Sequence, residues 1–162
     1  MTVNVIPSPV LSDGMVYLAS GFRGSALVAV DLDKAEGDIT GTDAVVWSLD
    51  RDTPYTPTPV LYQGNLYFTK VNSNILTVVD AKTGEQRYQT RIDGLGDVFA
   101  SLVAANGNIY ITGREGTTTV IKAGNSYEVV SINELDDMFD ASIAMVGDEI
   151  YLRGRNLYRI SK

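Results

Sequence analysis

The 162-residue chain contains no cysteine and no histidine. Disulfide bonds, thiolate chemistry, zinc sites built from Cys and His, and Ser-His-Asp triads are therefore excluded. A catalytic acid or base would have to be Asp, Glu, Lys or Tyr, and no pair of these residues stands out by its spacing. The lack of cysteine identifies no compartment, because reducing and oxidising compartments both contain cysteine-free proteins.

Positive charge and long apolar runs are also scarce. The chain has 13 Lys and Arg against 20 Asp and Glu, a formal net charge of −7. We therefore expect no nucleic-acid partner, since the net field repels polyanions and anionic membranes alike. No apolar run is long enough to span a bilayer, and the opening MTVNVIPSPV has neither the basic nor the apolar region of a signal peptide. The sequence predicts no membrane span and leaves the localisation open.

The chain does contain a sequence repeat, which occurs in four copies. The copies are PSPVLSDGMVYLAS (7–20), TPTPVLYQGNLYFT (56–69), ASLVAANGNIYIT (100–112) and ASIAMVGDEIYLR (141–153). Each copy places a tyrosine three residues after a turn position, and the copies recur at intervals of roughly forty to fifty residues, which is typical of propeller and solenoid arrays. The tyrosines occupy equivalent strand positions, which indicates packing between units: Tyr17, Tyr67, Tyr110 and Tyr151.

Each unit has the pattern of four short strands. In the second unit, TPVLY and NLYFT flank a QGN turn, and two further strands follow at 75–80 and 86–92, separated by the turn AKTGE. The sequence therefore predicts an all-β protein, a β-propeller of four-stranded antiparallel blades. A sandwich of hairpins is less favoured, because it has no reason to reuse one offset four times. We expect a single domain, 1–162, with approximate blades 1–52, 53–95, 96–136 and 137–162.

Two segments of the repeat carry a family resemblance. They are SPVLSDGMVYLAS with ALVAVDL in the first unit and VVDAKTGE (78–85) in the second; Trp47 and Tyr88 follow at matching positions. This pattern resembles the PQQ-like repeat of quinoprotein-type β-propellers, which usually carries Trp at that position. The segment 113–130 resembles the closing blades of bacterial, non-catalytic members. The resemblance covers essentially the whole chain and implies a ring of seven or eight blades and a periplasmic or other extracytoplasmic location, but no activity.

The fourth unit is incomplete. It contains FDASIAMV, EIYLR and NLYRIS but no fourth strand, so the chain holds about 3.75 blades, half of a seven- or eight-bladed ring. We therefore expect it to correspond to the C-terminal half of a longer propeller. Apolar blade faces would be exposed at both ends of such an arc. We expect a homodimer, in which two copies related by a two-fold axis close an eight-bladed ring and bury those faces.

One face of a propeller gathers the loops between strands 2 and 3 and the segments between blades. We take seven side chains there as candidate ligand-binding residues: Arg23, Lys70, Arg114, Arg155, Tyr55, Phe99 and Phe139. The same loops carry Arg153, Asp52, Asp97, Asp137 and Asp140. A pocket of this composition would suit a carbohydrate, an anionic metabolite or a peptide segment. Alternatively, the Arg and Asp side chains pair with one another and hold neighbouring blades together.

The opposite face is acidic but predicts no cofactor. Its segment DLDKAEGDITGTD (31–43) is similar to a calcium loop, yet Ala35 and Thr42 stand where the EF-hand pattern requires ligands. We therefore expect no calcium. The resemblance also implies pyrroloquinoline quinone (PQQ) as a cofactor to consider. We expect no PQQ, because nothing in the chain matches the family's cofactor-site residues and the adjacent cysteines of many such dehydrogenases are missing. We expect neither catalytic nor metal-binding residues.

Three functions remain open at this point. The favoured one is a non-catalytic scaffold or binding module whose partner is a protein or a carbohydrate. The resemblance also implies two alternatives: a fragment of a PQQ-dependent dehydrogenase, and a protein-assembly propeller of the outer-membrane assembly type. The dehydrogenase is the less favoured alternative, because the chain lacks cysteine and histidine and matches none of the family's cofactor-site residues, whereas the sequence does not separate the other two functions.

Overall fold

The computed structural model describes residues 1–161, and each of the four repeats forms one antiparallel sheet. Blade 1 consists of β1 (Val10–Ser12), β2 (Met15–Ser20), β3 (Ala26–Asp31) and β4 (Val45–Leu49). Blade 2 consists of β5 (Val60–Tyr62), β6 (Asn65–Thr69), β7 (Ile75–Asp80) and β8 (Gln86–Arg91). Blade 3 consists of β9 (Val103–Ala105), β10 (Asn108–Thr112), β11 (Thr117–Lys122) and β12 (Val129–Glu134). Blade 4 has three strands, β13 (Ala144–Val146), β14 (Glu149–Arg153) and β15 (Leu157–Ile160).

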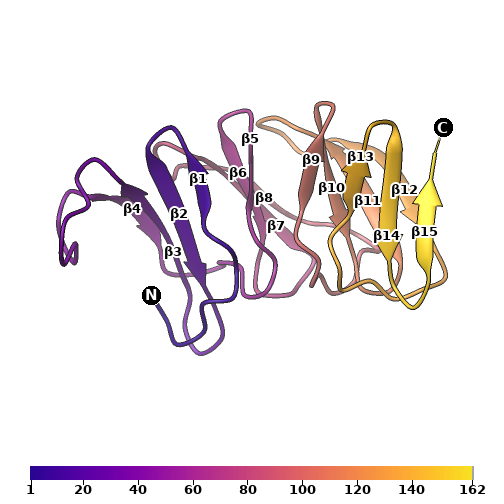
Figure 1. The fold of residues 1–162 in the computed structure, drawn as a ribbon, viewed down its shortest axis with the longest axis horizontal. Helices are drawn as coiled ribbons and strands as arrows, with labels where there is room; N and C mark the ends of the chain where they lie inside the picture. Colours follow the sequence, from indigo (N-terminus) through magenta and orange to yellow (C-terminus); the bar gives the residue numbers. More distant parts are fainter. Residues whose placement is uncertain (162) are drawn as a thin grey trace.

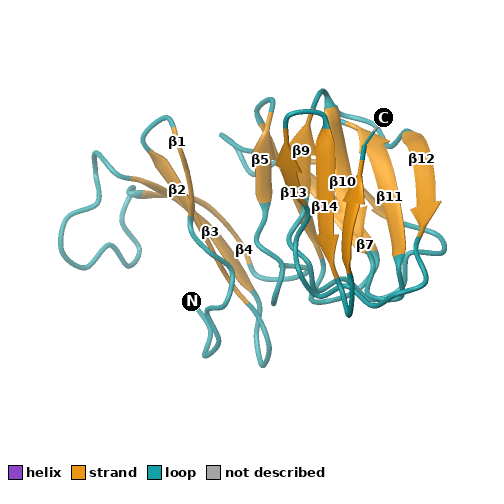
Figure 2. Ribbon diagram, turned by 45° about the vertical axis from the view of Figure 1, so that its right-hand side comes forward, coloured by secondary structure: helices purple, strands orange, loops and turns teal. Residues whose placement is uncertain are grey.

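The predicted architecture is confirmed. The strands of each sheet follow one another in chain order, and sheets of four, four, four and three strands correspond to about 3.75 propeller blades. Figure 1 shows the blades side by side in chain order, with the two termini at opposite ends of the row. Figure 2 shows that strands and loops make up the described chain, and no helix capable of crossing a membrane occurs in residues 1–161.

A glycine-containing turn joins the first and second strands in each of the first three blades. The turns Asp13–Gly14 and Gln63–Gly64 have positive φ at both residues, 49° and 75° in the first and 50° and 77° in the second. Two successive positive φ angles define the two-residue hairpin turn whose twist matches that of the flanking strands. The glycine at the turn position of the repeat, which was used to predict the strands, is therefore explained by the positive φ that the hairpin turn requires.

The hydrophobic core lies between the blades. Tyr17 and Leu27 of blade 1 pack against Leu66 and Phe68 of blade 2. The other face of β6 carries Tyr67, which packs on blade 3. Neighbouring residues of one strand thus point to opposite neighbours, as the pleat of a strand requires. A third cluster between blades 3 and 4 includes Tyr110, so the first three repeated tyrosines all pack between blades, as predicted.

The outer strand of blade 1 docks on the next blade through Trp47. Its indole N–H donates a hydrogen bond to the carbonyl oxygen of Ala81, at 2.9 Å. The ring lies against the turn at Gly84, where φ is 73° and an added Cβ would come within 2.7 Å of the indole. In blade 2, Tyr88 takes the corresponding place and packs near Tyr127, with ring centroids 6.4 Å apart. Its hydroxyl is buried and has no hydrogen-bond partner among residues 1–161.

Replacing Tyr88 by phenylalanine is therefore expected to raise the free energy of unfolding by about 1 kcal/mol. The substitution removes a hydroxyl that loses its hydration on folding and gains no hydrogen bond in return. Burial also raises the pKa of Tyr88 above its ordinary value, so the wild-type side chain stays neutral. Urea denaturation of Tyr88→Phe against the wild type measures the change. A loss of stability above about 1 kcal/mol would show that the hydroxyl is hydrogen bonded in solution.

Candidate functional site

The loops between strands 2 and 3 lie on the same side of the row as the segments between blades, and together they form what we call the loop face, at the lower edge of Figure 1. Backbone hydrogen bonds join the two kinds of segment. The N–H of Arg114 donates to the oxygen of Asp97 at 2.7 Å, and the N–H of Phe139 donates to the oxygen of Arg114 at 3.0 Å. The N–H of Val71 likewise donates to Thr53 at 2.9 Å.

Arg114 connects the segments that precede and follow blade 3. Its guanidinium lies 4.5 Å from the centroid of the Phe99 ring, within the range of cation–π attraction. One terminal nitrogen lies 3.1 Å from a carboxylate oxygen of Asp140. Three of the predicted positions therefore meet here, and they do so as a contact between blades.

Two further candidates, Lys70 and Tyr55, lie close to blades 1 and 2. The ammonium of Lys70 is 2.8 Å from the carboxylate of Asp52, and this contact lowers the pKa of Asp52. The ring of Tyr55 stacks on Phe22, with centroids 5.5 Å apart, and the guanidinium of Arg23 lies 5.6 Å from the Phe22 centroid. Phe22, which the sequence reasoning missed, is 50% exposed and links Arg23 to Tyr55. Its position directly before Arg23 at a loop tip could have identified Phe22 from the sequence.

Asp137 organises the loop between β14 and β15. Its carboxylate accepts hydrogen bonds from the backbone N–H groups of Asn156 at 2.9 Å, Arg155 at 3.1 Å and Met138 at 2.7 Å. These bonds, the one from Asn156 foremost, lower the pKa of Asp137 to about 2. The Arg155 side chain reaches the Met138 sulfur at 3.8 Å, and Arg153 beside it is exposed. Asp137 is thus a structural cap, and the cations remain available at the surface.

Replacing Asp137 by alanine is expected to speed amide hydrogen exchange at Arg155 and Asn156 by roughly tenfold, since both lose a charged acceptor. The pKa of Asp137 is lowered by folding, so its stabilisation is complete above about pH 4 and disappears as the pH falls towards about 2. Corrected for the intrinsic rate at each pH, the protection of these two amides in the wild type should fall over that window, whereas their protection in Asp137→Ala should not change. Asp136→Ala, an exposed neighbour, is the matched control. Equal exchange in both variants would contradict the capping role.

Phe139 lies elsewhere than the prediction placed it. It is 0% exposed and packs with Ile143 and Leu152 between blades 3 and 4. Its ring makes an edge-to-face contact with Tyr158, with the ring centroids 5.7 Å apart. It therefore belongs to the core and has no surface for a ligand. Lys70 pairs with Asp52, and the other candidates form separate clusters around Phe22, around Arg114 and around Arg155 rather than one shared pocket.

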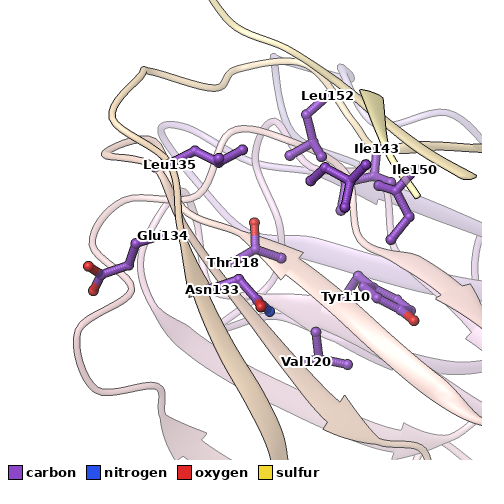
Figure 3. Close-up of a pocket in the computed structure, with 11 residues that line it drawn as sticks. Tyr110, Thr118, Val120, Asn133, Glu134, Leu135, Ile143, Ile150 and Leu152 are labelled. Carbon is purple, nitrogen blue, oxygen red and sulfur yellow. The ribbon is translucent and has the colours of Figure 1, made fainter. Parts of the chain in front are cut away.

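An apolar cavity, which no sequence pattern predicted, lies between blades 3 and 4. It has a volume of about 400 Å³ and is lined by residues of β10–β12 and β14–β15, with Tyr110, Val120, Ile150 and Leu152 among them. Figure 3 shows the apolar side chains around the cavity and Glu134 to one side. Such a cavity depends on how two sheets are spaced, which no local sequence pattern reports.

The segment similar to a calcium loop is held by contacts of its own. The carboxylate of Asp31 accepts a hydrogen bond from the Asp33 N–H at 3.1 Å and lies 3.4 Å from the ammonium of Lys34. Within residues 1–161, no group of three or more acidic side chains is placed to hold a metal ion. The absence of calcium and PQQ stays a prediction.

Antiparallel four-stranded sheets with their cores between neighbours define a protein of the β-propeller class. A family model described as outer membrane protein assembly factor BamB matches residues 1–162, and the chain belongs to that family. This confirms the predicted resemblance to PQQ-like propellers. No curated protein matched the chain significantly.

Solved structures of propellers resemble the chain in fold. The quinohemoprotein alcohol dehydrogenase from Comamonas testosteroni has a TM-score of 0.68 and 14% identity, over 92% of this chain and 29% of the enzyme. The computationally designed Ika8 protein has a TM-score of 0.67 and 9% identity, over 95% of this chain and 45% of that one. Myxococcus xanthus glutaminyl cyclase has a TM-score of 0.61 and 13% identity, over 98% of this chain and 66% of the enzyme. The chain thus spans less than a third of the dehydrogenase, and these likenesses show the fold alone.

Proposed function

We propose that the chain is a non-catalytic β-propeller scaffold that binds a partner through its loop face. The observation that carries this proposal is that the carboxylates on the loop face make structural contacts with cations and loops. Asp52, Asp137 and Asp140 each hold a cation or a loop in place, and the pKa values of Asp52 and Asp137 are lowered. A general acid needs a pKa near the working pH, which is the opposite shift.

The group best placed to bind a partner is the exposed cluster of Phe22, Arg23 and Tyr55. Stacked aromatic rings beside a guanidinium suit the faces of sugar rings or the side chains of a peptide. Arrays of oligosaccharides and peptides, probed with the wild type and with Phe22→Ala, test this assignment. We expect at least tenfold weaker binding by the variant and no change for Val146→Ala, an exposed apolar control on blade 4. Equal binding by Phe22→Ala would remove the cluster from the proposal.

The family match favours a second, more specific role in outer-membrane protein assembly. Direct binding to purified components of an outer-membrane assembly machinery tests it, with Phe22→Ala as the weakened variant. The dehydrogenase alternative is tested separately, by adding PQQ and Ca²⁺ and following dye reduction with alcohols or sugars. We expect no reduction. Turnover that depends on the quinone would overturn the non-catalytic proposal without bearing on partner binding.

We propose further that two copies of the 162-residue chain pair to close an eight-bladed ring. The outward face of blade 1 is apolar, with a cavity of about 310 Å³ lined by Leu18, Val28 and Val30 among others. On blade 4, Tyr151 has the strand position of the three tyrosines that pack against a following blade. Two-fold pairing would bring this face of one copy onto blade 1 of the other.

Light scattering over a dilution series measures this directly. We expect a species of twice 17.5 kDa for the wild type and a 17.5 kDa monomer for Val28→Asp, which places a charge in the contact. A monodisperse 17.5 kDa wild type at all concentrations would refute the pairing.

A further inference from the structure

The acidic side of the row, opposite the loop face, contains the same slot between successive blades. Each slot lies between the end of the first strand of one blade and the hairpin turn of the next. Between blades 2 and 3 a tyrosine fills it. Tyr62, the last residue of β5, packs against the core between these blades, and its hydroxyl accepts a hydrogen bond from the backbone N–H of Gly107 at 3.0 Å.

Between blades 1 and 2 the corresponding residue is Ser12. Ser12 pairs with Met15 across its hairpin as Tyr62 pairs with Asn65, so the two residues are equivalent in register. A serine is too short to cross the slot, and a cavity of about 430 Å³ opens there, lined by Tyr17, Leu61 and Gly64 among others. The third slot repeats the observation on a smaller scale. Its equivalent residue is Ala105, which pairs with Asn108, and a cavity of about 200 Å³ opens between blades 3 and 4.

The empty first slot presents two polar groups without partners. The N–H of Gly64 corresponds to that of Gly107, and no acceptor among residues 1–161 pairs with it. The hydroxyl of Tyr17 corresponds to that of Tyr67, which accepts a hydrogen bond from the Gly124 N–H at 2.9 Å.

Tyr17 has no such donor within the described chain. Lys82 stands where Gly124 stands in the next blade, and its N–H donates to Asp80 at 2.9 Å instead. Tyr17 is only 3% exposed, and burial raises its pKa, so a neutral, unpaired hydroxyl lines the cavity. A hydroxyl that opens onto a cavity without a protein partner is free to form a hydrogen bond with a ligand there.

We propose that the slot between blades 1 and 2 binds a phenol group, the tyrosyl side chain of a partner peptide. The ring occupies the place that Tyr62 takes in the next slot, against Met15, Tyr17 and Leu61. Its hydroxyl accepts a hydrogen bond from Gly64 and pairs with the Tyr17 hydroxyl. The slot lies on the opposite side from the loop face, so its proposed binding of a phenol group does not depend on the proposed function of that face.

The test is an NMR titration of the ¹⁵N-labelled 162-residue protein with N-acetyl-tyrosine amide. We expect a saturable downfield shift of the Gly64 amide proton, with a dissociation constant on the order of 1 mM for so small a probe. N-acetyl-phenylalanine amide should bind about fivefold more weakly, because it lacks the hydroxyl. Tyr17→Phe should weaken binding of the tyrosine probe by a similar factor.

Ser12→Tyr is the sharpest variant, since it supplies the proposed occupant from within the chain. We expect it to shift the Gly64 amide proton downfield without any probe and to weaken probe binding at least tenfold. Ser12→Ala, which leaves the slot empty, is the matched control and should bind as the wild type does. Three results would each overturn the proposal: no Gly64 shift with the tyrosine probe, equal affinity for the phenylalanine probe, or unaltered binding by a folded Ser12→Tyr. Should Ser12→Tyr not fold, Tyr17→Phe and the two probes still decide.

Discussion

Replacing Phe139 by alanine is expected to lower the free energy of unfolding by about 3–5 kcal/mol, the usual cost of truncating a fully buried phenylalanine. Phe139 is 0% exposed and belongs to the cluster that joins blades 3 and 4, together with Ile143 and Leu152. Blade 4 has only three strands, and this cluster packs it against blade 3. We therefore expect the loss to be concentrated in blade 4.

Hydrogen exchange and urea denaturation together check this result. Amides of β13–β15 in Phe139→Ala should exchange much faster, while those of β6 and β7 keep most of their protection, because repeat proteins open unit by unit. Met138→Ala is the control: Met138 is the preceding residue, is 43% exposed and should change stability by less than about 0.5 kcal/mol. Phe139→Leu, which keeps most of the volume, should cost less than about 1.5 kcal/mol. A loss below about 1 kcal/mol in Phe139→Ala would show that the cluster does not hold blade 4.

Phe139 also shows where sequence reasoning stops. The sequence indicated correctly that the residue lies in a segment between blades, and that segment does follow the loop face. It did not indicate that the ring turns inward. Strand and helix periodicities say which side chains are buried in regular elements, but they say nothing in an irregular segment. The direction is set by tertiary contacts such as the hydrogen bond from the Phe139 N–H to the Arg114 oxygen.

The blades themselves were predictable because local and long-range signals agree. The turns at Gly14, Gly64 and Gly107 all have the positive φ that the pattern required, and alternation then decides which strand residues face each neighbour. The cavities were not predictable in the same way. The exchange of Tyr62 for Ser12 is visible in the aligned repeats, but its consequence appears only when two blades are packed together.

The contacts of the loop face answer a question that the sequence left open. Arginine, lysine and aspartate could either line a pocket or pair across blades, and the structure pairs Arg114 with Asp140 and Lys70 with Asp52. Exposed pairs of this kind contribute little stability individually. Their value lies in fixing the loops, whereas Phe22 is 50% exposed and Arg153 and Arg155 are exposed on the same face.

The second large effect is expected at Trp47, the only tryptophan in the chain. Trp47→Ala should lower the free energy of unfolding by about 3 kcal/mol, because the ring packs between blades 1 and 2 and its N–H bonds to Ala81 at 2.9 Å. Trp47→Phe keeps most of the packing but loses the hydrogen bond, so about 1–1.5 kcal/mol of that loss should remain. Val46→Ala, an exposed neighbour on the same strand, should be nearly neutral.

A double-mutant cycle with Gly84 separates packing from general destabilisation. Gly84→Ala alone suffers twice, from the left-handed φ of 73° and from a Cβ that would approach the indole within 2.7 Å. In a Trp47→Ala background the second penalty disappears, and only the backbone strain of about 1 kcal/mol remains. The two substitutions should therefore be less than additive by at least about 1 kcal/mol, measured by urea denaturation followed by circular dichroism. Strict additivity would mean that the indole does not rest on this turn in solution, and that the outer strand of blade 1 is held to blade 2 by other contacts.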